Sequence, residues 1–332
     1  MAELRLDPVR RRWIITGKRV PMPDALDSGA RCPFCPGNER FTPQAIRERL
    51  DSNGAWQVRV FHDRAPLFRV EGALGSEAEG MFDRMNALGA HEIVVETNQH
   101  GKLLGELTPD EIADVLETYR DRIVDLKRDR RFRYVSVFKH QGRGISPHEE
   151  HSHSQILATP VVPALVEREL RWSLIHYRRK QRCIYCDILH QEGQSRERVV
   201  DESADYVCLC PFAARFPYEI WVIPVGHESS FERDMATRPR LFSLATFLKM
   251  NLLRIQKTSH RLRFSLHTEP NMASGALEPD RWQTIPDDYH WHIEIHPELD
   301  EEPQPIDEEG FYFNPIPAEE AAAILRKIEP EP

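Results

Sequence analysis

The sequence predicts an α+β fold built from two similar halves, which form a mostly antiparallel sheet with helices packed on one face. Three observations predict it. The same order of motifs occurs twice along the chain, which is typical of an internal repeat. In each repeat, β-type runs with polar turns alternate with one long helical pattern. The chain of 332 residues also exceeds the roughly 250–300 residues at which a single hydrophobic core usually stops growing.

The repeat is defined by cysteine and histidine motifs. Each half begins with Cys-x-x-Cys and continues with a glutamate, a short apolar run and a lone histidine. A helix, a strand, a polar loop and His-x-His follow in the same order. We match Glu92 with Glu219, because His100 and His227 each stand eight residues after their glutamate.

The helices and strands follow from residue periodicity. Thr108-Pro109-Asp110-Glu111 has the form of a capped helix start, and apolar residues recur at helical spacing through Ile123. Apolar periodicity likewise predicts helices over 238–256 and 317–328. Expected strands are 13–15, 57–61, 134–138, 264–267 and the segment with Cys208 and Cys210.

The two halves are expected to divide near residue 165. The proline-rich stretch 159–163 ends the first half there. Residues 1–165 would form the half that carries His-x-His-x-Gln, and residues 166–332 a structural half that supports substrate binding.

Composition argues against two classes of protein. A mean hydropathy of −0.54 and the lack of any apolar run of about 18 residues argue against membrane insertion. The net charge of −9 argues against general binding to nucleic acid, because phosphate-backbone binding needs clustered basic residues. The first residues lack the apolar segment of a secretory signal, so a cytoplasmic protein is expected.

The cysteine pairs indicate metal binding, since disulfides are rare in a reducing compartment. Closed zinc sites usually have four thiolate and imidazole ligands. The repeat selects one such set in each half: Cys32, Cys35, His100 and His151, and then Cys183, Cys186, His227 and His290. We expect about two zinc ions per chain, with iron as an alternative in the second site. The opposing interpretation is two pairs of buried thiols. His91 is left out because it has no counterpart in the second half.

The first His-x-His predicts the chemistry. Alternate side chains of a strand share one face, so His151, His153 and Gln155 would line up. One histidine could then bind metal, the next could attack a phosphate, and the glutamine could donate a hydrogen bond to a phosphate oxygen. The second half has Glu294 instead of a glutamine, and its charge would repel a phosphate. The first half is therefore predicted to be catalytic.

The segment His151-Ser152-His153-Ser154-Gln155 resembles the active-site motif of the galactose-1-phosphate uridylyltransferases and the related sugar-nucleotide phosphorylases, a branch of the histidine triad superfamily. With the cysteine pairs and lone histidines, the resemblance spans nearly the whole chain. It implies two histidine-triad-like halves, His153 as nucleophile and His151 as a zinc ligand. It also implies ping-pong transfer of a nucleoside monophosphate, UMP by family frequency, between a sugar nucleotide and a hexose 1-phosphate. Members are commonly homodimers with a shared site.

The chain departs from this family at several substrate-contacting positions. Asp63 and His140 stand where the family often has asparagine. The family also has an arginine-rich segment that contacts phosphate, and of its arginines this chain keeps Arg19. The segment 146–150 replaces a turn of small residues with bulk and charge. Arg19, Asp63 and His140 are therefore the candidate substrate contacts, and the base and sugar stay open.

Two other functions stay open. Phosphate or water could resolve the same covalent intermediate, which would make the protein a phosphorylase or hydrolase of sugar nucleotides or dinucleoside polyphosphates. The altered 146–150 loop could instead mark a zinc-stabilised nucleotide-binding protein without catalysis. Such a protein would bind a nucleotide without forming a covalent adduct.

Overall fold

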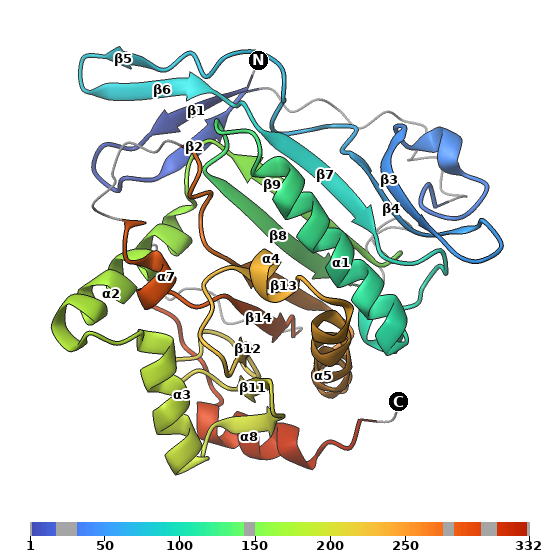
Figure 1. The fold of residues 1–332 in the computed structure, drawn as a ribbon, viewed down its shortest axis with the longest axis vertical. Helices are drawn as coiled ribbons and strands as arrows, with labels where there is room; N and C mark the ends of the chain where they lie inside the picture. The colour runs from blue at the N-terminus through green and yellow to red at the C-terminus, as the bar shows by residue number, and fades with distance from the viewer. Residues whose placement is uncertain (1, 18–31, 143–149, 275–281, 300–310, 331–332) are drawn as a thin grey trace.

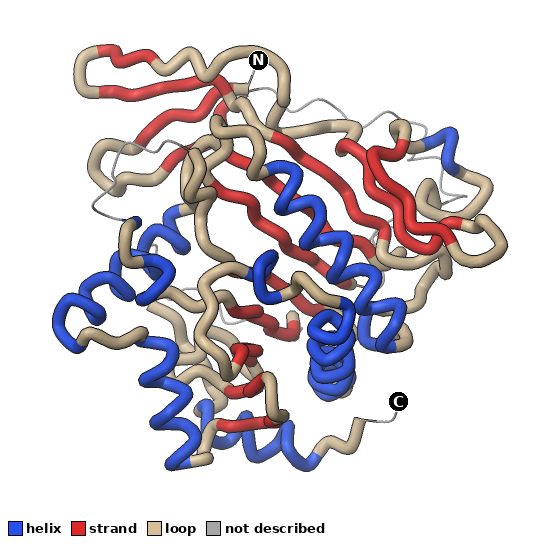
Figure 2. The backbone as a smooth tube through the Cα atoms, viewed as in Figure 1, coloured by secondary structure: helices blue, strands red, loops and turns tan. Residues whose placement is uncertain are grey.

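The computed structural model describes residues 2–17, 32–142, 150–274, 282–299 and 311–330. Most of the strands in these ranges form one ten-stranded sheet, and a four-stranded sheet lies beside it (Figures 1 and 2). Strand pairings within both sheets are antiparallel. The predicted α+β class with a mostly antiparallel sheet is confirmed.

The large sheet repeats one strand order on either side of a central seam. In the first half the order is β3 (Ala45–Leu50), β4 (Trp56–His62), β7 (Ala90–Val95), β9 (His153–Thr159) and β8 (Tyr134–Gln141). In the second half the matching order is β10 (Val199–Glu202), β11 (Tyr206–Leu209), β12 (Ile220–Pro224), β14 (His292–Pro297) and β13 (Leu262–His267). The seam is the antiparallel pairing of β8 with β13, so the halves share one continuous sheet. The boundary near residue 165 stays a prediction.

Strand register corrects the alignment of the two halves by one residue. Ile93 lies opposite Gln155, and Trp221 lies opposite Glu294. Ile93 and Trp221 are therefore equivalent, and the predicted match of Glu92 with Glu219 is wrong by one position. A slip of one residue reverses the face to which a strand side chain points, so the two glutamates lie on opposite faces.

Two long helices cover one face of the large sheet. α1 (Pro109–Leu126) and α5 (Arg238–Gln256) pack against each other and against the main hydrophobic core (Figure 1). Thr108 and Glu111 form the predicted capping box at the start of α1. The predicted closing helix is α8 (Ala318–Lys327), which packs beside β10.

The opposite face carries helices that the sequence analysis did not predict. They are α2 (Ala164–Lys180) and α3 (Ile184–Ser195). Leu170 of α2 belongs to a core with Leu209 and Ile223, whereas their neighbours Cys208 and Val222 face the main core. These strands are apolar on both sides, and both sides must be covered. The prediction of helices on one face is therefore wrong.

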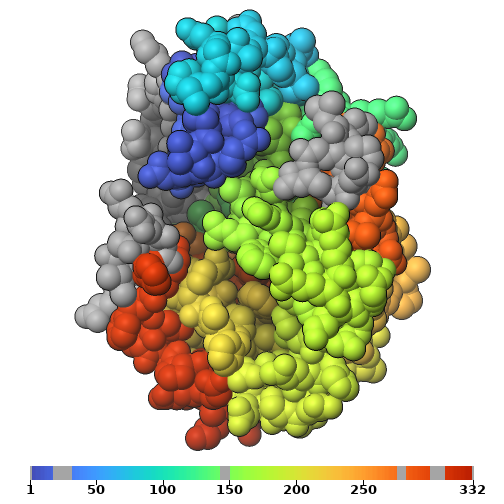
Figure 3. All heavy atoms as spheres, turned by 90° about the vertical axis from the view of Figure 1, so that its left-hand side faces the viewer, coloured from blue at the N-terminus to red at the C-terminus, as the bar shows by residue number. Residues whose placement is uncertain are grey.

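The small sheet packs against the end of β9. Its order is β2 (Trp13–Thr16), β1 (Glu3–Leu6), β6 (Phe82–Asn86) and β5 (Glu77–Glu79). Leu4 packs with Trp13, Leu157 and Val161. Figure 3 shows these N-terminal strands in blue beside the green α2. Short helices with described bounds are η2 (Glu39–Phe41), η3 (Leu104–Glu106), α4 (Phe231–Asp234) and α7 (Ile285–Asp288).

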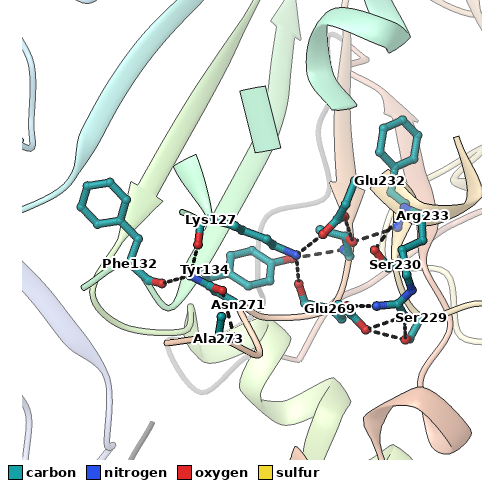
Figure 4. A network of polar contacts seen from close by, with 12 residues as sticks. Lys127, Phe132, Tyr134, Ser229, Ser230, Glu232, Arg233, Glu269, Asn271 and Ala273 are labelled. Carbon is teal, nitrogen blue, oxygen red and sulfur yellow. Dashed lines mark hydrogen bonds and ion pairs between the residues drawn. The ribbon is translucent and has the colours of Figure 1, made fainter. Parts of the chain in front are cut away.

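A partly buried polar network joins the end of α1 to the second half (Figure 4). The Lys127 ammonium lies 2.6 Å from Oε1 of Glu232 and 2.8 Å from the carbonyl oxygen of Glu269. Asn271 donates to the carbonyl oxygens of Lys127 and Phe132, each at 2.9 Å. Within the described ranges, no helix combines the length and apolar character needed to span a bilayer.

Candidate active site and metal centres

The residues of the first predicted metal set meet where β7 ends and β9 begins. Cys32, Cys35, His100 and His151 each offer a donor atom, and these atoms lie within 4.8 Å of one another. Nδ1 of His151 lies 3.5 Å from Sγ of Cys32 and 3.7 Å from Sγ of Cys35. Its Nε2 bonds the carbonyl oxygen of Thr97 at 2.8 Å, so Nε2 carries the proton and the Nδ1 lone pair faces the thiols.

The second set repeats this geometry. Cys183, Cys186, His227 and His290 also bring their donor atoms within 4.8 Å of one another. Nδ1 of His227 lies 3.4 Å from Sγ of Cys186. The Nε2 atoms of His227 and His290 bond backbone carbonyl oxygens at 2.8 and 3.1 Å, which again turns Nδ1 toward the thiols.

The donor chemistry of both sets fits zinc. Two thiolates and two imidazoles are a usual ligand set of a closed zinc site. Burial raises the pKa of the Cys32 thiol to about 12, so a cation is needed to displace its proton. The second set has the same donors as the first, so nothing in its donors favours iron over zinc.

A third group of possible ligands was missed by sequence reasoning. Glu169, His267, His292 and Glu294 bring their donor atoms within 4.8 Å of one another. Such oxygen and nitrogen donors suit iron or manganese better than thiolate sets do. Nδ1 of His267 lies 2.9 Å from Oε2 of Glu169. Burial alone would lower the pKa of His267, but the charges of Glu169 and Glu294 raise it to about 9. Without a metal, His267 can therefore carry a proton that balances part of the negative charge of the two glutamates.

His153 begins β9, whereas His151 precedes the strand. The expectation that both histidines lie in the strand is therefore wrong for His151, which turns toward Cys32 and Cys35. Nδ1 of His153 bonds the carbonyl oxygen of His151 at 2.8 Å. A carbonyl oxygen only accepts, so Nδ1 carries the proton and the neutral ring has its lone pair on Nε2. The Phe34 ring lies edge-on to His153 with centroids 5.3 Å apart, which links the first cysteine loop to this imidazole.

His292 repeats the backbone contact of His153 in a different environment. Its Nδ1 lies 3.1 Å from the carbonyl oxygen of His290. However, His292 is 1% exposed, and its Nε2 lies 3.8 Å from Oε1 of Glu294. His153 is half-buried and is followed on its strand face by Gln155. Of the two His-x-His motifs, the first thus has a half-buried imidazole followed by a neutral amide, and the second a buried imidazole followed by a carboxylate.

Gln155 is hydrogen-bonded to His91, which lies beside Asp63. Nε2 of His91 lies 3.0 Å from Oε1 of Gln155, and its Nδ1 lies 3.3 Å from Oδ2 of Asp63. Asp63 also accepts from the backbone N–H of Ala65 at 2.9 Å. His91 was not among the predicted site residues; the signal that could have identified it is its place in β7, the strand that pairs with β9 of His153 and Gln155.

The remaining predicted substrate contacts are only partly placed. His140 is exposed near the end of β8. Phe138 lies opposite Gln155, so His140, two residues further, shares the sheet face of Gln155 and His153. Arg19 and residues 146–149 lie outside the described residues.

Comparisons with known proteins agree on one family. The family described as galactose-1-phosphate uridyl transferase, N-terminal domain, matches residues 7–163. ADP-glucose phosphorylase of Arabidopsis thaliana is 29% identical over 98% of this chain and 93% of its own length. Galactose-1-phosphate uridylyltransferase of Thermotoga maritima is 26% identical over the full length of both chains. The crystal structure of the Arabidopsis phosphorylase with bound ADP-glucose superposes with a TM-score of 0.74 at 28% identity, covering 99% of this chain and 100% of the other.

Proposed function

From the site and from these similarities we propose that the chain belongs to the galactose-1-phosphate uridylyltransferase family and transfers a nucleoside monophosphate, UMP in the first instance, between a sugar nucleotide and a hexose 1-phosphate. His153 is the proposed nucleophile and Gln155 its partner at the phosphate. The enzyme would thus act in galactose metabolism.

The contrast between His153 and His292 carries this proposal. Both rings donate from Nδ1 to a carbonyl oxygen two residues earlier, so both present Nε2. His292 is buried beside a carboxylate, whereas His153 is half-buried on the face that carries Gln155. An anionic phosphate can therefore approach His153 without charge repulsion, whereas the carboxylate beside His292 would repel it.

The reaction follows from this arrangement. Nε2 of His153 attacks the phosphorus next to the nucleoside, a P–N bond forms, and the P–O bond to the hexose 1-phosphate breaks. The Nδ1 proton stays on the ring and donates to the carbonyl oxygen of His151, and this hydrogen bond supports the positive charge of the substituted ring. A phosphate oxygen of the second hexose 1-phosphate then attacks phosphorus, and the P–N bond breaks. Gln155 would donate its amide N–H to the charged phosphoryl oxygens.

Zinc has a structural role in this proposal. Cys32, Cys35, His100 and His151 would hold one ion, and Cys183, Cys186, His227 and His290 a second. A bound ion would fix the cysteine loop whose Phe34 contacts His153. We also keep, as predictions, a homodimer, a cytoplasmic location, and Arg19, Asp63 and His140 as substrate contacts.

Phosphorolysis is the second candidate function, and one comparison favours it. The Arabidopsis relative at 29% identity is an ADP-glucose phosphorylase. In that reaction inorganic phosphate would take the nucleotide from His153 and release a nucleoside diphosphate. The two functions share the first half-reaction and differ only in the acceptor.

Intact mass spectrometry tests both functions. The zinc-loaded protein is incubated separately with UDP-glucose, UDP-galactose, ADP-glucose and GDP-glucose, and the mass gain identifies the transferred nucleotide. The labelled protein is then offered galactose 1-phosphate, glucose 1-phosphate, inorganic phosphate or buffer. Discharge by a sugar phosphate supports the transferase, and discharge by phosphate supports the phosphorylase. Binding of a sugar nucleotide without any adduct would refute both and support the non-catalytic alternative.

A further inference from the structure

A buried polar cluster lies beneath His153, on the face of the sheet opposite its imidazole. Glu96 directly follows β7 and Lys139 lies in β8. Nζ of Lys139 is 2.7 Å from Oε2 of Glu96, and neither side chain is more than 1% exposed. Ser152 and Ser154, the neighbours of His153, both donate a hydrogen bond to the Glu96 carboxylate. The proposed mechanism uses none of these side chains.

The cluster is fully hydrogen-bonded. Nζ of Lys139 contacts Oε2 of Glu96, Oγ of Ser152 at 2.9 Å and the carbonyl oxygen of His153 at 3.1 Å, which matches the three protons of an ammonium group. The Tyr119 hydroxyl of α1 donates to Oε1 of Glu96 at 2.6 Å. Burial alone would raise the pKa of Glu96, but the Lys139 charge and these hydrogen bonds lower it. The carboxylate is therefore ionised at neutral pH.

The second half builds the equivalent backbone on apolar residues. The register of β8 with β9 and of β13 with β14 makes Leu266 the counterpart of Lys139. By the His-x-His motif, the counterparts of the two serines are Trp291 and Ile293. All three are buried in the main hydrophobic core. Nδ1 of His292 nevertheless bonds the carbonyl oxygen of His290. The backbone of a His-x-His motif can therefore take this conformation without charged residues packed beneath it.

A buried ion pair is a costly way to stabilise a strand. Replacing such a pair with apolar residues of similar size is often neutral or stabilising, because the desolvation of both charges is avoided. The second half shows that this replacement is compatible with the fold. The Lys139–Glu96 pair lies beside the first His-x-His, which is followed by Gln155, whereas the second His-x-His has apolar residues in the matching positions. This difference indicates that the pair has a role other than stability.

We infer that the Lys139–Glu96 pair positions the nucleophile, an inference that rests on the proposed function of His153. The pair holds three consecutive residues: it binds the side chains of Ser152 and Ser154 and the backbone carbonyl of His153 itself. These contacts hold the backbone of His153 from the sheet face opposite its imidazole. They do not cover the face on which the imidazole would meet substrate. A displacement of about 1 Å between reacting atoms can cost roughly a hundredfold in rate. Lys139 is thus a positioning residue and does not touch the substrate.

The test compares two ion-paired lysines, the buried Lys139 and the partly buried Lys127. Lys139→Met removes one charge at similar side-chain size, and Lys127→Met does the same to the Lys127–Glu232 pair of Figure 4. Single-turnover formation of the adduct should slow about ten- to a hundredfold in Lys139→Met, with unchanged sugar-nucleotide affinity and zinc content. Lys127→Met should keep the wild-type rate. Wild-type rates in Lys139→Met, or equal slowing in both variants, would overturn the positioning role.

A double variant separates positioning from stability. Lys139→Met with Glu96→Leu removes both charges, so melting temperature should recover relative to Lys139→Met alone. Positioning predicts that the adduct rate stays low despite this recovery, whereas a purely structural role predicts that rate and stability recover together. If these variants fail to fold, Ser154→Ala removes only the hydroxyl that bonds Glu96 and Tyr119 and should still slow the adduct measurably. A wild-type rate in this variant would count against the inference. Absence of adduct in the wild type would instead refute the proposed function and, with it, this role.

Discussion

His91 holds the side-chain amide of Gln155. Its Nε2 lies 3.0 Å from Oε1 of Gln155, while its Nδ1 accepts from the backbone N–H of Leu67 at 3.4 Å and lies 3.3 Å from Asp63. The proton on Nε2 is donated to Oε1, so the NH₂ group of Gln155 is turned away from His91. A histidine that had appeared to compete for metal therefore orients the proposed phosphate-binding amide.

The first prediction follows from this contact. Gln155→Ala should slow adduct formation by about ten- to a thousandfold, the range expected for one donor to a charged transition state. His91→Ala should slow it less, because the amide remains but is no longer oriented. The double variant should be no slower than Gln155→Ala, since both residues act through one amide. Single-turnover mass spectrometry measures the three rates, and additive losses would contradict a shared role.

The second prediction concerns the nucleophile. His153→Gly should abolish the adduct and turnover while zinc content and folding stay close to wild type. Added imidazole should enter the space left by the side chain and restore partial transfer, releasing a free nucleotidyl-imidazole. Chromatography of the small-molecule products detects that compound.

The matched control for the nucleophile is its repeat partner. His292→Gly removes a buried ring and should lower the melting temperature through lost packing. The adduct should still form, and peptide mapping should place it on His153. An adduct mapped to His292, or a nucleotidylated His153→Gly protein, would show that the wrong half had been chosen.

The third prediction concerns metal. Purified protein should contain close to two zinc ions per chain, and Cys32→Ser and Cys183→Ser should each lose about one and melt at lower temperature. Cys32→Ser should also slow the adduct, because its loop carries Phe34 against His153. Folded Cys183→Ser protein should react at a rate nearer to wild type. Elemental analysis that finds neither zinc nor iron in fresh protein would refute the assignment.

The fourth prediction concerns alkaline pH. The pKa of His267 is raised from 6.5 to about 9 in the folded protein, chiefly by Glu169 working against burial. A group with a raised folded pKa stabilises the fold fully below its unfolded pKa and loses that effect as pH rises through the folded value. Stability should therefore decline between pH 6.5 and about 9. Glu169→Gln should flatten this decline. Thermal unfolding at fixed zinc content measures both proteins, and parallel curves would argue against the His267–Glu169 pair as its source.

Sequence alone determined the features that depend on residue type and short-range periodicity. The helix over 238–256 and the capped start at Thr108 were predicted as the structure has them, because capping and a 3.6-residue period are local properties. The duplicated motifs selected two sets of four donor residues, and the structure brings the members of each set together. Strand alternation placed His153 and Gln155 on one face for the same reason.

Only the tertiary structure decided what depends on strand register and on contacts between distant segments. His151 leaves the strand to meet Cys32, which is 119 residues away in the sequence. The one-residue slip between the halves, the link from His91 to Gln155 and the pair of Lys139 with Glu96 all arise where separate strands are placed side by side. The period of a single strand fixes which side chains share a face, but it carries no information about which strand lies next to it.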